Sequence, residues 1–159
     1  MIIDGLLMFD GAISTNGIAG VNQFANGATV TSTNVIDLIN QRDIGDGGDS
    51  FGTNLTVIVQ VTTAFTGGTS VNIQVQGSTD NVTYVVYSET GAIPVASLTV
   101  NSKWAVRMPP VNPDLVGPAP RYLRVGYVNV GANTTGAVVT WLGTPDDNRY
   151  YKPGIVVAN

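Results

Sequence analysis

Apolar and polar residues alternate most regularly between residues 54 and 77. Successive side chains of a β-strand point to opposite faces of a sheet, so this period of two predicts two strands that each bury one face. The intervening positions carry mostly amide and hydroxyl side chains, which suit a solvated face. Gly67 and Gly68 predict a turn that joins the two strands as an antiparallel hairpin. The aliphatic positions are Leu55, Val57, Val59 and Val61 in the first strand and Val71, Ile73 and Val75 in the second.

Strand patterns recur along most of the remaining chain, and no helical period of useful length appears. About eight short strands separated by turns are typical of a β-sandwich. Five prolines between residues 109 and 120 predict a stiff crossover between two sheets, which favours a jelly roll. An immunoglobulin-type sandwich is the second choice, without its Cys…Trp…Cys marker. The further strands are predicted at residues 30–38, 82–88, 103–108, 121–130 and 137–142, and residues 1–8 form either a first strand or a clamp on a partner.

Composition divides the chain into three parts. Residues 1–29 have an apolar start followed by a stretch rich in Gly, Asn, Ala and Ser, and they predict an N-terminal arm and a long loop. Residues 30–143 contain the predicted strands and form the jelly-roll domain, and residues 144–159 predict an extended C-terminal tail. A long loop beside a compact domain indicates function or partner contact.

Charged residues are unusually few. They make up 11% of the chain, against about 25% in ordinary globular domains. A surface with so few ions to desolvate suits burial against other protein. The net charge of −4 without a basic stripe argues against nucleic acid as a partner. No apolar run approaches the roughly 20 residues of a membrane-spanning helix, and the start lacks the basic segment of a signal peptide, so we expect synthesis in the cytoplasm.

The sequence offers little for catalysis or for a cofactor. It contains no cysteine and no histidine, which removes the usual general base and the usual ligands of transition metals. Residues 43–49 contain Asp43, Asp46 and Asp49, but their spacing does not match a calcium-binding loop, and we expect a turn. We therefore predict no enzyme, no metal and no cofactor. The candidate paired acids are Asp37, Asp43, Asp80, Glu89 and Asp114, nearly all in predicted turns.

Aromatic and apolar residues suggest two kinds of contact. Trp104, Trp141 and the strand tyrosines predict core packing, although they leave a carbohydrate-binding module as the alternative function, with a cell-surface glycan as its ligand. Tyrosine and arginine are favoured anchors of protein interfaces, and both occur in the C-terminal tail. The predicted interface residues are Ile2, Leu6, Met8 and Phe9 in the arm and Arg149, Tyr150, Tyr151 and Lys152 in the tail.

Four segments, taken in order, carry a resemblance to a known family. They are Val35–Leu38 followed by Arg42–Gly45, the predicted hairpin, Thr90–Leu98, and Arg121–Val125. Together they resemble the capsid cement (decoration) proteins of tailed bacteriophages over about residues 32–142. The segment Ala12–Thr29 is longer than that family leads us to expect.

This resemblance implies a jelly-roll domain on the outside of an icosahedral phage head. It implies self-association on a symmetry axis, as a homodimer or a homotrimer, and bridging of neighbouring major capsid protein subunits. It implies no catalytic or ligand-binding residue. Edge strands and arms that add to a neighbour's sheet would provide the contacts, and many weak contacts on a symmetric shell gain from multivalency.

Overall fold

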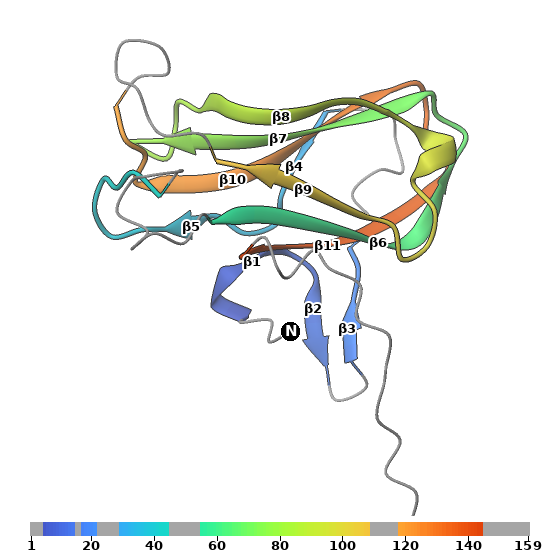
Figure 1. Ribbon diagram of the computed structural model, residues 1–159, viewed down its shortest axis with the longest axis horizontal. Helices are drawn as coiled ribbons and strands as arrows, with labels where there is room; N and C mark the ends of the chain where they lie inside the picture. Colours follow the sequence, from blue (N-terminus) through green and yellow to red (C-terminus); the bar gives the residue numbers. More distant parts are fainter. Residues whose placement is uncertain (1–4, 15–16, 22–28, 45–54, 109–117, 145–159) are drawn as a thin grey trace, which may run out of the picture.

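The computed structural model describes residues 5–14, 17–21, 29–44, 55–108 and 118–144 (Figure 1). Within these residues the regular elements are strands and two short 3-10 turns, η1 (Gly5–Leu7) and η2 (Val95–Ser97). The strands form two antiparallel sheets, which pack as a sandwich, and a separate hairpin. The predicted all-β sandwich is therefore confirmed.

The first sheet has the strand order β1-β11-β6-β9. Its strands are β1 (Met8–Asp10), β11 (Thr135–Gly143), β6 (Thr56–Thr66) and β9 (Lys103–Arg107). The second sheet has the order β4-β10-β7-β8, and β5 pairs with β10 further along the same edge as β4. Its strands are β4 (Val30–Thr31), β5 (Ile36–Asp37), β10 (Tyr122–Val130), β7 (Ser70–Ser78) and β8 (Val85–Pro94). The separate hairpin consists of β2 (Ala12–Ser14) and β3 (Gly17–Ala19).

The strands pair in a nested order that identifies a jelly roll. Strand β1 pairs with β11, β4 and β5 pair with β10, β6 pairs with β9, and β7 pairs with β8. The chain thus behaves as one long double-stranded ribbon. Rolling up this ribbon adds the pairs β11–β6 and β10–β7, and the result is a four-stranded and a five-stranded sheet packed around one core.

The predicted hairpin between residues 54 and 77 is wrong in its pairing. Both strands exist, as β6 and β7, but they lie in different sheets and do not pair with each other. Gly67, with a φ of +91°, lies in the turn that carries the chain from one sheet to the other. The alternation determines which face of a strand is buried, and it does not determine which strand lies beside it.

The aliphatic face predicted for these strands does form the core. Val59 and Val61 of β6 belong to the same buried cluster as Ile73 and Val75 of β7, and each is at most 2% exposed. Because β6 and β7 belong to opposite sheets, this cluster fills the space between the two sheets. Its largest fully buried member is Tyr127 of β10.

A second buried cluster lies on the outer face of the first sheet. It consists of Met8, Ile58, Val139 and Trp141, which alternate along their strands with residues of the main core. Strand β6 is therefore buried on both faces near its start. The predicted solvated face of β6 is wrong at Ile58, which is fully buried.

The N-terminal segment joins the sandwich instead of remaining apart from it. Strand β1 forms the edge of the first sheet beside β11, and Val21 continues the same edge through a bridge to Val138. The β2–β3 hairpin is inserted between these two contacts. Together with η1 it forms what we call the N-terminal projection, which extends from the sandwich beside β1 and β11 (Figure 1).

Candidate protein-binding surface

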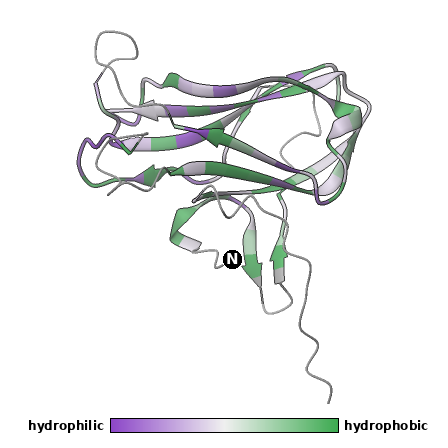
Figure 2. Ribbon diagram, in the orientation of Figure 1, coloured by the Kyte–Doolittle hydropathy of each residue, from purple (hydrophilic) through white to green (hydrophobic). Residues whose placement is uncertain are grey.

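The N-terminal projection exposes apolar side chains. Leu6 of η1 is 85% exposed and Ile13 of β2 is 57% exposed. Ile13 pairs directly with Ile18 of β3, so both isoleucines lie on one face of the hairpin. Figure 2 shows hydrophobic residues both on η1 and on the β2–β3 hairpin. The described residues of the projection carry no charge at the surface, because Asp10 at its base is buried.

Glycines allow the base of the projection to lie close to the sheet. Gly11 has a φ of +117°, and a Cβ atom there would lie 2.7 Å from Met8 Cε and 3.2 Å from Val139 Cγ1. A Cβ atom on Gly20 would clash with the hydroxyl of Thr62. Because Met8 and Val139 belong to the outer cluster of the first sheet, the base of the projection covers that face.

A buried carboxylate fixes the edge strand at this base. The register between β1 and β11 is irregular between Met8 and Asp10, and the Asp10 side chain is fully buried. The backbone N–H of Thr33 donates to Asp10 Oδ1 at 2.8 Å, and the Thr33 hydroxyl donates to the same oxygen at 2.9 Å. The Tyr127 hydroxyl donates to Asp10 Oδ2 at 2.6 Å and is 2.7 Å from Thr140 Oγ1. Burial and the neighbouring Asp10 charge raise the pKa of Tyr127 well above its ordinary value, so this donor stays protonated.

Comparison with known families gives one match. The model of the Bbp16 family matches residues 22–142, which is most of the chain and nearly all of the sandwich. The chain belongs to the Bbp16 family. This is a family of phage proteins, so the resemblance to phage proteins is confirmed at that level. No curated protein matches the chain.

The predicted interface residues of this Bbp16 protein fall in different environments. Leu6 is exposed on the N-terminal projection. Met8 and Phe9 are 3% and 0% exposed, because they belong to the outer cluster and to the main core, so neither side chain is presented to a partner. The other five predicted residues lie outside the described residues: Ile2, Arg149, Tyr150, Tyr151 and Lys152.

Ile13 and Ile18 were missing from the sequence-based interface prediction. The available signal was the Asn16-Gly17 dipeptide between them, which favours a tight hairpin turn. Asp10 was also missing from the candidate acids. Its role depends on the irregular register of β1 and on a tyrosine 117 residues away, and no local pattern reports either of these.

The candidate acids do not converge on a catalytic centre within the described residues. Asp80 accepts bonds from the N–H groups of Val82 and Thr83 in its own turn, and these bonds lower the pKa of Asp80. Asp43 lies in the described residues, whereas Asp46, Asp49 and Asp114 lie outside them. No cluster of three or more His, Cys, Asp or Glu residues that could hold a metal ion occurs in the described part of the chain.

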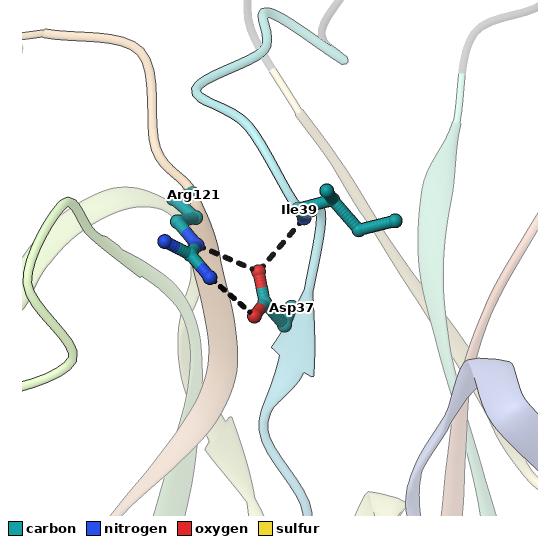
Figure 3. Close-up of polar contacts among 3 residues, drawn as sticks. All are labelled: Asp37, Ile39 and Arg121. Carbon is teal, nitrogen blue, oxygen red and sulfur yellow. Dashed lines mark hydrogen bonds and ion pairs between the residues drawn. The ribbon is translucent and has the colours of Figure 1, made fainter.

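Asp37 forms an exposed ion pair with Arg121 (Figure 3). Arg121 Nε donates to Oδ1 and Nη2 donates to Oδ2, both at 2.9 Å, in the bidentate geometry that arginine favours. The N–H of Ile39, which has a φ of +70°, also donates to Asp37 at 2.7 Å. The Arg121 hydrogen bonds lower the pKa of Asp37. This pair links two of the segments that carry the family resemblance, and it closes the β5–β10 edge.

The tryptophans do not form a platform for a sugar ring. Trp141 is buried in the outer cluster, and Trp104 is partly buried against the main core. Tyr84 and Tyr122 are half-buried, and arginine side chains cover their rings: Arg124 lies 3.6 Å from the Tyr84 centroid and Arg121 lies 4.8 Å from the Tyr122 centroid. Among the described residues, no helix is long and apolar enough to cross a membrane.

Proposed function

We propose that the protein is a capsid decoration protein that binds the outer surface of a phage head and bridges neighbouring major capsid protein subunits. It acts mechanically and performs no reaction. In this proposal it belongs to the exterior of the virion and self-associates as a dimer or a trimer. Its family of phage proteins and its resemblance to cement proteins support this function.

The N-terminal projection is the observation that carries the proposal. An uncharged apolar element that extends from a stable sandwich is costly to expose to water and is suited to burial against another protein. A sandwich held by a fully buried core provides the rigid base that a clamp requires.

The size of the apolar contact suits a decorated shell. Full burial of a leucine or isoleucine contributes about 1.5–3 kcal/mol. Leu6 and Ile13 are already partly covered, so their burial on docking would contribute about 2–4 kcal/mol together in each copy. A contact of this strength is weak alone, but two or more linked copies on neighbouring subunits raise the overall affinity through effective concentration.

Expanded heads that lack the protein provide the test. The purified chain is mixed with such heads and sedimented, and filled heads with and without it are then heated while DNA release is recorded. We expect the chain to co-sediment and to raise the temperature of DNA release. If undecorated heads resist heat equally well, or if the chain stays in the supernatant, the proposed function is wrong.

A further inference from the structure

The outer face of the second sheet carries a continuous row of hydrogen-bonded polar side chains. Arg124 Nε donates to Gln76 Oε1 at 2.8 Å, and Gln76 Nε2 donates to Gln74 Oε1 at 3.0 Å. Gln74 Nε2 and Asn72 Nδ2 both donate to Glu89 Oε2, at 2.9 and 2.8 Å. We call this row the polar ladder. It crosses β10, β7 and β8, three adjacent strands of one sheet.

The polar ladder holds planar groups in fixed positions and leaves part of their hydrogen-bonding capacity unused. A glutamine amide has two N–H donors and two acceptor lone pairs, and Gln74 uses one of each within the ladder. Gln76 likewise uses one donor and one acceptor. The two amide donors lower the pKa of Glu89, so its carboxylate stays ionised at neutral pH. The face therefore offers ordered donors and acceptors side by side.

The polar ladder is electrically balanced, and a glycine lies beside it on β10. Gly126 of β10 pairs with Gln74, and the Gln76 amide occupies the place where a side chain on Gly126 would lie. The charges of Glu89 and Arg124 oppose each other within the row. The Arg124 guanidinium lies over the ring of Tyr84, which helps to hold this arginine in place at one end of the row.

We propose that this face binds a neutral oligosaccharide. Adjacent sugar hydroxyls both donate and accept hydrogen bonds, which matches a row of amides flanked by one carboxylate and one guanidinium. An anionic polymer fits less well, because the row has a single cation and a carboxylate beside it. A fixed row also loses little side-chain entropy when a ligand binds.

The position of the polar ladder suits a protein on a shell. The N-terminal projection covers the outer face of the first sheet, and the ladder lies on the outer face of the second, so they are on opposite sides of the sandwich (Figure 1). A copy docked through the projection presents its ladder to the solution, a point that rests on the proposed function. Many copies on one head would convert weak binding of each sugar into strong adhesion.

A glycan array tests the proposal. Beads that carry many copies of the full-length chain are applied to an array of neutral and N-acetylated oligosaccharides from bacterial surface polysaccharides. We expect binding to at least one of them. The substitutions Gln74→Ala and Arg124→Ala should each weaken it about tenfold, the effect of one lost hydrogen bond. Gln60→Ala is the matched control, because Gln60 is a half-buried amide on β6 of the first sheet and should leave binding unchanged.

The outcomes separate this proposal from the proposed function. Thermal melts of each variant exclude a folding defect, and head binding by Gln74→Ala should remain normal. Absence of signal from every oligosaccharide, or full binding by both ladder variants, overturns the glycan proposal and leaves the docking proposal intact. Loss of head binding in the ladder variants instead identifies this face as a protein contact and also overturns it.

Discussion

Replacement of Tyr127 by phenylalanine tests how the edge strand is anchored. The substitution removes only the hydroxyl, and the ring remains in the core. It takes away the 2.6 Å bond to the Asp10 carboxylate and the 2.7 Å contact with Thr140 Oγ1. A hydrogen bond to a charged group contributes about 1.5–3 kcal/mol, and one between neutral groups about 0.5–1.5 kcal/mol. Asp10 keeps both Thr33 donors, so its charge stays partly compensated.

The expected loss is therefore about 2–4 kcal/mol in the free energy of unfolding. For a chain of this length, that loss corresponds to a fall of about 5–15 °C in Tm. Differential scanning calorimetry measures it directly. The control is Tyr122→Phe, because Tyr122 is half-buried and its hydroxyl makes no hydrogen bond with the described residues. This control should change stability by less than about 0.5 kcal/mol.

An unchanged Tm for Tyr127→Phe would refute the anchoring argument. An equal fall in both variants would also refute it, because the effect would then come from the loss of any tyrosine hydroxyl. Hydrogen exchange at the Thr33 amide gives a second measurement. This amide donates to Asp10, so it should exchange faster in Tyr127→Phe and at the wild-type rate in Tyr122→Phe.

Two further predictions concern the core and the exposed ion pair. Ile73→Asp should abolish cooperative folding, because Ile73 is 2% exposed and an unpaired buried charge costs several kcal/mol out of a total stability of about 5–15 kcal/mol. The control Gln76→Asp, on the outward face of the same strand, should fold. A cooperative thermal melt of Ile73→Asp would show that the strand register is wrong. The pKa of Asp37 is lowered in the folded chain, so its pairing with Arg121 stabilises the fold at pH values above the ordinary aspartate pKa, and this stabilisation is lost as the pH falls through the lowered value. An NMR titration should show that the pKa of Asp37 rises in Arg121→Gln. An unchanged pKa would contradict the bidentate pairing.

Sequence periodicity predicted the strands because burial of one face leaves a direct trace in residue order. Strands β9, β10 and β11 lie within two residues of their predicted bounds at every end. The predicted strand at residues 30–38 instead divides into β4 and β5. Ser32 keeps a backbone bond to the Val125 carbonyl of β10, but the N–H of Thr33 donates to Asp10 and the N–H of Asn34 donates to the Phe9 carbonyl, so the pairing with β10 is interrupted after Ser32. These bonds join residues more than 20 positions apart and leave no pattern of apolar residues in the sequence.

Strand pairing and the candidate binding surface could be recognised only in the three-dimensional structure. The pairing of β6 with β11 and β9, in place of β7, depends on how the whole ribbon rolls up. Met8 and Phe9 are apolar residues in an apolar arm, and only the position of β1 beside β11 shows that they are buried. Leu6 and Ile13 have the same composition and are exposed, because the hairpin that carries Ile13 is inserted into the edge strand and extends away from it.

The most direct test of the central claim is the occupancy of phage heads by a variant of the N-terminal projection. The double variant Leu6→Asp/Ile13→Asp is compared with Val100→Asp/Val130→Asp, whose valines are about half exposed elsewhere on the surface. Expanded heads are incubated with each protein, and the bound copies are counted by quantitative mass spectrometry. The proposed docking predicts that the projection variant loses at least about 30-fold in affinity for the heads, equivalent to about 2 kcal/mol, while the control binds as the wild type does. Equal occupancy by both variants would contradict docking through the projection.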